Sequence, residues 1–297
     1  MLFSVPKPTI VLLLIFCGLS LKSQTIIQEK NFYPNGSIQE KYNAYTSNDD
    51  TLKHGAYFFY YPEGSVMQEG VFIDNMPDSV WVNYYRNGFR KSMYKYSKGK
   101  KNGRFQVWNN DGSLYQKGEY IDDKLNGTLI TYHPNGKIDS KSQYKDGVLH
   151  GKSMVYSEEG EILLLANYKN DTLNGPWESY HPTGEINYKG RRLNGEFHDT
   201  LKTFYKNGQL QRIGFYSHGK LEGKVIGYHK NGTLMNISYF NNGILEGKYQ
   251  EYYPNGVLAE QGTYTNGERT GRWTSYYPDE TIRSVGLFKN GKYHYYW

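Results

Sequence analysis

Eight histidines are the residues of this sequence best suited to bind a metal ion or to carry a proton near neutral pH. Their spacing is regular: one set is His133, His181 and His229, 48 residues apart, and a second set is His54, His150 and His198, 96 and 48 residues apart. A zinc site needs its histidine nitrogens at about 2 Å from one ion. The chemistry therefore depends on the distance that the fold places between residues 48 positions apart.

Other catalytic motifs are absent from the sequence. Cys17 is the only cysteine, there is no Gly-x-Ser-x-Gly, and no glycine loop leads into a predicted helix. The carboxylate pairs Asp49-Asp50, Asp122-Asp123 and Glu158-Glu159 fall in predicted loops, where acids are normally solvated. General acid-base catalysis needs groups tuned by burial or by close partners. We therefore predict no catalytic residues, no cofactor and no enzymatic activity.

A period of 24 residues organises the chain and sets the distances between these side chains. A turn glycine recurs with this period, and an aromatic residue stands four positions before each one. The glycines are Gly64, Gly88, Gly112, Gly136, Gly160, Gly184, Gly208, Gly232 and Gly256, with Glu280 in the next slot, and the aromatic residues are Tyr60, Tyr84, Trp108, Tyr132, Tyr156, Tyr180, Phe204, Tyr228, Tyr252 and Tyr276. A second aromatic slot, represented by Tyr120, follows a small residue such as Gly118 and is interrupted by Arg192.

Each repeat is predicted to be a β-hairpin. In one unit Phe105 to Asn109 is a strand, Asn110-Asp111-Gly112 a tight turn, Leu114 to Tyr120 the return strand, and Asp122 to Gly127 the link onward. Asn and Gly suit the left-handed conformation of such turns. A lone hairpin is marginally stable, so each unit must pack on the next. At about 10 Å per repeat, histidines two repeats apart are about 20 Å apart, which excludes a zinc site within one set and leaves these imidazoles at strand ends beside the turns.

The predicted fold is all-β, an elongated single-layer antiparallel β-hairpin repeat array of about ten and a half repeats and on the order of 100 Å long. It covers residues 24–297, with an insertion near residues 43–50 and an incomplete last repeat at Asn290-Gly291-Lys292. The apolar slot of Phe105 lies three positions before the aromatic slot of Trp108, an odd spacing. Either a bulge realigns the two slots or both faces of the sheet carry aromatic residues.

Residues 1–23 differ from the rest of the chain. Lys7 precedes an unbroken apolar stretch from Ile10 to Leu19, which is too short for a membrane-spanning helix of roughly 20 residues and is typical of a secretory signal. We expect a protein exported to the periplasm or the cell surface; the alternative is an uncleaved anchor. A lipid anchor on Cys17 is disfavoured because Phe16 stands where such a signal needs a small residue.

Cleavage would remove Lys7 and Lys22 and no acid, leaving a net charge of +4. In sequence these charges are evenly scattered, without a polybasic block, so we predict no nucleic-acid partner.

The repeat written as it occurs, from Gly247-Lys248-Tyr249 through Pro254-Asn255-Gly256 and Gly262-Thr263-Tyr264 to Asn266-Gly267, resembles the bacterial variant of the MORN repeat. The resemblance covers roughly residues 31 to 297. It implies a single-layer, MORN-like solenoid of antiparallel hairpins and a scaffold for protein or lipid contact. Bacterial variant proteins often have an antitoxin-like family label, which agrees poorly with export.

The leading functional hypothesis is a scaffold for protein-protein interaction, with a protein of unknown identity as partner. The slot after the first aromatic is the predicted contact surface, and Arg191 with Arg192, which breaks the aromatic slot, is a predicted basic contact; burial against the next hairpin is the alternative for the slot. Its residues are Tyr61, Tyr85, His133, His181, Tyr205, His229, Tyr253 and Tyr277. Ser79, Asp199 and Glu280, which replace glycines, are interpreted as drift.

Two other functions stay open. One is binding of an envelope glycan, a lipid or another small ligand by aromatic residues of adjacent hairpins, although the few tryptophans disfavour such cages. The weaker one is an antitoxin-like partner protein.

Overall fold

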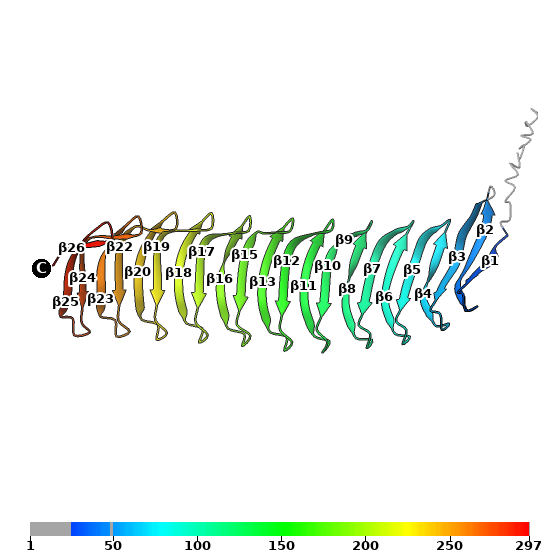
Figure 1. Cartoon of the computed structure of the whole chain (residues 1–297), viewed down its shortest axis with the longest axis horizontal. Coiled ribbons are helices and arrows are strands. Elements are labelled where there is room, and N and C mark those ends of the chain that lie inside the picture. Colours follow the sequence, from blue (N-terminus) through cyan, green and yellow to red (C-terminus); the bar gives the residue numbers. More distant parts are fainter. Residues whose placement is uncertain (1–24, 48–49, 297) are drawn as a thin grey trace, which may run out of the picture.

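The computed structural model describes residues 25–47 and 50–296, with side chains to residue 294, and the predicted signal segment 1–23 lies outside this part of the chain. Among the described residues there is no helix, and all strands belong to one antiparallel sheet of 26 strands. The single-layer, all-β hairpin array predicted from the sequence is confirmed (Figure 1).

The strands of the first half are β1 (Ile27–Phe32), β2 (Ile38–Ser47), β3 (Asp50–Tyr60), β4 (Val66–Ile73), β5 (Met76–Tyr84), β6 (Arg90–Ser97), β7 (Lys100–Trp108), β8 (Leu114–Ile121), β9 (Lys124–Leu125), β10 (Gly127–Tyr132), β11 (Ile138–Lys145), β12 (Val148–Tyr156) and β13 (Ile162–Lys169). Those of the second half are β14 (Thr172–Leu173), β15 (Gly175–Tyr180), β16 (Ile186–Leu193), β17 (Glu196–Phe204), β18 (Leu210–Ser217), β19 (Lys220–Tyr228), β20 (Leu234–Asn241), β21 (Ile244–Leu245), β22 (Gly247–Tyr252), β23 (Leu258–Thr265), β24 (Glu268–Tyr276), β25 (Ile282–Lys289) and β26 (Lys292–Tyr296).

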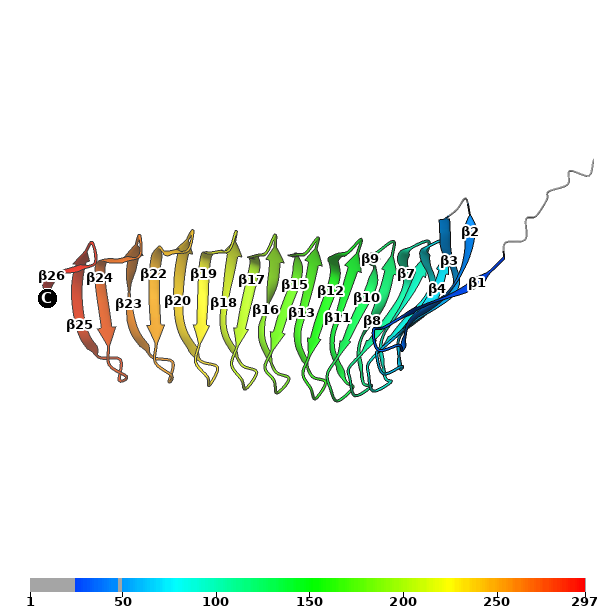
Figure 2. The same cartoon turned by 45° about the vertical axis from the view of Figure 1, so that its right-hand side comes forward.

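Each strand pairs with its neighbours in sequence, so the strands lie across the long axis (Figures 1 and 2). β9, β14 and β21 are the detached first parts of the strands that β10, β15 and β22 continue. Where the chain has four additional residues between Gly36 and Gly64, β2 and β3 are 10 and 11 residues long, against 8 and 9 for β6 and β7.

The asparagine-glycine turns form one long edge of the sheet. In the turn after β5, the amide of Tyr85 donates to the carbonyl of Phe89 at 2.8 Å and the amide of Gly88 donates to that of Tyr85 at 2.9 Å. Gly88 is left-handed at φ 84°, whereas Asn87 is not among the positive-φ residues. This is a three-residue loop that ends in a glycine bulge, so the left-handed requirement falls on the glycine alone.

The other long edge corrects the predicted link from Asp122 to Gly127. Asp122 and Asp123 have φ values of 46° and 65° and form a two-residue hairpin turn. The same positions hold Asn-Gly at Asn194-Gly195, Asn242-Gly243 and Asn266-Gly267. Two left-handed central residues match the twist of the flanking strands. Every connection along the chain is therefore a hairpin, and the repeat is one turn of a continuous meander.

A bulge follows each two-residue turn. In β7, Gly103 has a φ of 119°, and the pairing with β6 shifts register between Tyr94 and Tyr96. Ser79 and Asp199 occupy this position in their repeats and keep φ values of 60° and 63°. Glu280, in the slot of the turn glycine, likewise keeps a φ of 70°. The backbone of the array is thus unchanged where the glycine is lost.

One face of the sheet, the core face, holds the best-buried side chains. Trp81, Phe105, Val225 and Trp273 are 6%, 2%, 1% and 3% exposed. Each lies in the same slot of its repeat, directly opposite the small-residue slot in the register. A Cβ on Gly262 would lie 2.1 Å from the indole of Trp273, so the ring of one repeat covers the glycine of the preceding strand.

The opposite face, here the basic face, carries the Trp108 slot. Phe105, Gln106, Val107 and Trp108 pair in unbroken succession along β7, so side chains alternate and Phe105 and Trp108 lie on opposite faces. Both faces therefore carry aromatic residues, which decides between the two alternatives. Beside this half-buried aromatic row, cations far outnumber the acids Glu69, Glu119 and Glu178; the cations are Lys95, Arg104, Lys117, Lys141, Lys152, Lys189, Arg191, Lys202, Lys224, Lys248 and Arg272.

Candidate functional site

The predicted contact slot contacts the next repeat through its polar atoms. The hydroxyls of Tyr61, Tyr85, Tyr205 and Tyr253 donate to backbone carbonyls of Tyr84, Trp108, Tyr228 and Tyr276 at 2.8 to 2.9 Å. Each bond reaches 23 residues ahead and ties one asparagine-glycine turn to the following one. Tyr277 is the exposed member of this set, at 49%. The ring faces that remain accessible, rather than the hydroxyls, are what this slot offers to a partner.

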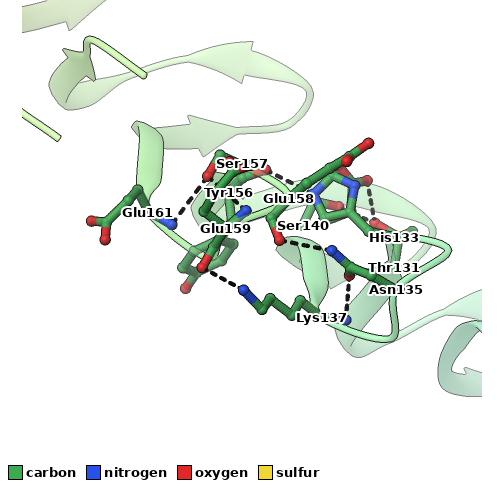
Figure 3. A network of polar contacts seen from close by, with 11 residues as sticks. Thr131, His133, Asn135, Lys137, Ser140, Tyr156, Ser157, Glu158, Glu159 and Glu161 are labelled. Carbon is green, nitrogen blue, oxygen red and sulfur yellow. Dashed lines mark hydrogen bonds and ion pairs between the residues drawn. The ribbon is translucent and has the colours of Figure 1, made fainter. Parts of the chain in front are cut away.

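The histidines of this slot make the same contact. Nε2 of His133 lies 3.0 Å from the carbonyl oxygen of Tyr156, and Nε2 of His229 lies 2.8 Å from that of Tyr252 (Figure 3). Around His133, the side-chain amide of Asn135 donates to the carbonyl of Glu158 and the ammonium of Lys137 donates to that of Glu159, both at 2.8 Å. The histidines thus join adjacent turns as tyrosines do elsewhere, while Nε2 of His181 is buried and has no hydrogen-bond partner in the described residues.

Arg191 and Arg192 lie on opposite faces. Arg192 packs into the core face, with its guanidinium carbon 3.4 Å from the ring centroid of Phe197 and 5.0 Å from that of Trp177. Burial lowers the pKa of Arg192, and its Nε has no hydrogen-bond partner in the described residues. Arg191 is exposed on the basic face and lies 4.0 Å from Asp199. Of the two arginines, Arg191 is the one that an external partner can reach.

Aromatic clusters of the core face already hold cations of the chain. Nζ of Lys101 lies 4.4 Å and 5.1 Å from the ring centroids of Tyr94 and Tyr120. Lys53 and Arg269 lie in the same slot over the rings of their own repeats, and each also pairs with an acid, Glu40 and Glu260 respectively. Arg192 and Phe197 exchange the two roles, because the cation occupies the aromatic slot and the ring occupies the cation slot.

Titratable groups of the array respond to these local contacts. Burial, followed by the hydrogen bond to Glu178, raises the pKa of Tyr180 to about 12, and the hydrogen bonds from Tyr180 and Lys189 lower the pKa of Glu178. Burial also raises the pKa of Tyr57, Tyr94 and Tyr249 above the usual value. Residues 25–47 and 50–296 contain no group of three His, Cys, Asp or Glu that could hold a metal ion, and no helix in them could cross a membrane.

The basic face has shallow hollows between its rows of side chains. One of about 590 Å³ is lined by Arg104, Gln106, Lys117, Glu119 and Ile130, and one of about 280 Å³ by Lys152, Met154, Leu165, Pro176 and Glu178. The sequence analysis missed this concentration of charge because the cations alternate with core residues along each strand. Aligned in the 24-residue frame, a single slot contains Arg104, Lys152, Lys224, Lys248 and Arg272, which was the available signal.

The MORN repeat variant family model matches nine segments, which together make up well over half of the chain: residues 27–44, 53–74, 125–146, 149–170, 173–194, 200–218, 221–242, 245–266 and 269–290. The chain belongs to the MORN repeat variant family. Its unmatched residues 75–124 form the same hairpins, with Ser79 and Tyr94 in place of small residues of other repeats. MORN repeat proteins are generally non-enzymatic scaffolds for protein or membrane contact.

No curated protein matches this MORN repeat variant chain. Among solved structures, the crystal structure of TcdB2-TccC3 without its hypervariable C-terminal region is similar over 86% of this chain and 17% of that chain, with 10% sequence identity and a TM-score of 0.17. This chain thus spans less than a fifth of that protein's length, and no common fold follows from a score this low.

Proposed function

We propose that this protein is a non-catalytic scaffold, exported to the periplasm or the cell surface, that holds a protein partner along its sheet. The observation that carries the proposal is the single-layer architecture: both faces of every strand reach solvent over the whole array, and the side chains form rows along it. A rigid surface of this kind presents side chains at a low entropic cost. It does not enclose a reacting group away from water, as catalysis requires.

The tyrosine and histidine slot remains part of this proposal through its ring faces. Because the hydroxyls hold neighbouring turns together, replacing Tyr205 or Tyr253 by Phe removes a structural hydrogen bond and keeps the ring. Replacement by Ser also removes the ring. A contact role requires that partner binding falls in the Ser variants and is retained in the Phe variants.

The competing function is binding of a glycan or another small ligand between hairpins. The core-face clusters oppose it, since Lys53, Lys101, Arg192 and Arg269 already lie over the rings that a cationic ligand would use. A ligand would have to displace a tethered cation from each cluster.

The test combines localisation with capture. The full chain, tagged at its C-terminus and expressed in its host, is located by cell fractionation, cross-linked in intact cells and purified. The proposal predicts that the chain is in the envelope or the medium with one reproducible cross-linked protein. A cytoplasmic chain, retention on a glycan array without a protein partner, or hydrolysis of generic substrates by the purified chain would overturn it.

A further inference from the structure

We propose that the basic face between β16 and β22 binds an extended acidic segment of a partner protein. This inference rests on the proposed scaffold function and specifies the chemistry of the partner. The region, here called the β16–β22 patch, consists of the side chains that lie beside one another on five neighbouring hairpin strands and carry the cations Lys189, Arg191, Lys202, Lys224 and Lys248.

The middle row of the patch is aliphatic. Ile213 pairs with Ile226, which in turn pairs with Ile237, so three isoleucines lie side by side across β18, β19 and β20. All three are half-buried. On the side of the asparagine-glycine turns they adjoin the half-buried ring row, and on the other side they adjoin Phe215 and Tyr239, which are 42% and 37% exposed. Exposed aromatic residues beside half-buried aliphatic ones are the usual anchors of a protein interface.

The cations of the patch lack partners within the chain. Lys189 lies 2.9 Å from Glu178, but its register partner on the other side is Lys202, a second cation. Like charges placed directly opposite each other on a sheet are destabilising. Among the described residues, Lys202, Lys224 and Lys248 form no ion pair, and all three are exposed. An anionic occupant would relieve this repulsion, so the patch is complementary to negative charge.

The spacing of the patch favours a polypeptide. Equivalent residues of successive repeats, such as Lys224 and Lys248 or Phe215 and Tyr239, are about 10 Å apart along the array. Three residues of extended chain span about the same distance. A segment that lies along the array can therefore place an acid at every third position and an apolar side chain between. Single-stranded nucleic acid stacks successive bases on its aromatic platforms, which rings one repeat apart do not provide.

The isoleucine row also disfavours a bilayer as the occupant. A narrow chain can contact the isoleucines between the two flanking rows of larger side chains, whereas a flat lipid surface would first meet the rings and the lysines. The sheet turns along its length, so that β4 to β8 are seen closer to edge-on than β19 to β25 in the second view (Figure 2). A flexible chain can follow this turn.

The test measures binding of a fluorescein-labelled peptide made of four Asp-Leu-Ser units to the full chain by fluorescence anisotropy. The triple variant Lys202→Gln, Lys224→Gln and Lys248→Gln is expected to weaken the Kd about tenfold, since each exposed ion pair contributes up to about 1 kcal/mol and 1.4 kcal/mol is a factor of ten. The pair Phe215→Ser and Tyr239→Ser is expected to weaken it similarly. Circular dichroism melting verifies that each variant is folded.

Two controls isolate the geometry. The triple variant Arg86→Gln, Lys206→Gln and Lys230→Gln removes the same charge from exposed positions at the asparagine-glycine edge and should leave the Kd within about twofold. A peptide with the same composition but its four Asp residues adjacent should bind more weakly than the spaced peptide. Equal loss in the two triple variants, or equal binding of an Asn peptide, would overturn the proposal.

Competitors identify other occupants. Vesicles containing phosphatidylglycerol, or single-stranded DNA, that displaced the peptide at lower charge concentration than the peptide itself would assign the patch to a membrane or a nucleic acid and refute this inference. Cross-linking separates it from the scaffold function. If the patch triple variant captures the partner as well as the wild type does, the inference fails and the scaffold stands; if the wild type captures no partner, the scaffold itself fails.

Discussion

The core face is built differently in two stretches of the same array. Between β3 and β5, Tyr57, Phe72 and Trp81 form a cluster with ring centroids 4.9 to 5.3 Å apart, over Gly70. Between β11 and β13 the equivalent slots hold Ser142, Ser153 and Ala166, and the two serine hydroxyls lie 2.8 Å apart. The bulges and turns are the same in both stretches. The backbone is therefore set by the turn and bulge residues, while the paired slots adjust their volumes to each other.

The largest effect is expected from alkaline pH, which acts on the tyrosine-rich stretches. Burial first, and neighbouring acids second, raise the pKa of Tyr57 and Tyr180 above the ordinary value of 10, to about 12 for Tyr180. A raised folded-state pKa contributes stability that is present below pH 10 and is lost as the pH rises through the raised value. We expect cooperative unfolding in this window, with tyrosinate absorbance and far-ultraviolet circular dichroism changing together. Tyrosinate formation that precedes unfolding throughout would contradict this expectation.

Replacement of the core tryptophan separates the two stretches. Trp81→Ala is expected to lower the free energy of unfolding by about 3 to 5 kcal/mol, because it leaves a cavity among Tyr57, Phe72 and Tyr96. Ser153→Ala, in the equivalent slot, removes one hydroxyl contact and is expected to cost about 1 kcal/mol or less. Urea unfolding followed by circular dichroism measures both. Similar losses would show that the aromatic cluster is not the stronger core.

The small-residue slot gives a matched pair of opposite changes. Gly262→Ala would place a Cβ 2.1 Å from the indole of Trp273, and overpacking of this kind costs about 1 to 3 kcal/mol. Ala166→Gly removes a Cβ that faces Ser153 and is expected to cost about 0.5 to 1 kcal/mol. Thermal melting of the two variants ranks them. A neutral Gly262→Ala would refute the paired adjustment of slot volumes.

The exchanged pair Arg192 and Phe197 can be tested by reversal. Each single variant, Arg192→Phe or Phe197→Lys, is expected to lose about 1 kcal/mol, because the cation-ring contact becomes ring against ring or cation against cation. The double variant restores the order seen at Lys101 and Tyr120. A double-mutant cycle should give a favourable coupling of about 0.5 kcal/mol or more. Additive losses would mean that the two slots are independent.

The smallest effect is expected where glycine has been lost from a left-handed position. Ser79→Gly, Asp199→Gly and Glu280→Gly relieve residues with φ values of 60°, 63° and 70°. Each is expected to stabilise the protein by up to about 1 kcal/mol, since a side chain in this conformation costs more than the additional freedom of glycine in the unfolded chain. Melting temperatures that fall in all three variants would show that these side chains, rather than the backbone, determine the local structure.

Most of the fold could be predicted from the sequence because the period places turn glycines and rings in fixed slots. The two-residue turn at Asp122-Asp123 was misinterpreted as a link because aspartate pairs resemble a solvated loop, although both residues are left-handed. The basic face could not be seen in the linear charge pattern, since Lys224 and Lys248 become neighbours only across paired strands. Arg192 appeared to be a surface misfit because its compensating partner, Phe197, lies in a different slot.

The orientation of the strands has a mechanical consequence. Because every strand lies across the long axis, the ladder hydrogen bonds run along that axis, between one strand and the next (Figure 1). Tension applied to the two ends of the array would load the bonds of one terminal strand at a time and peel the hairpins in succession at low force. Tension applied along the strands would instead shear a whole ladder at once. The array is therefore expected to be stiff across its width and extensible along its length.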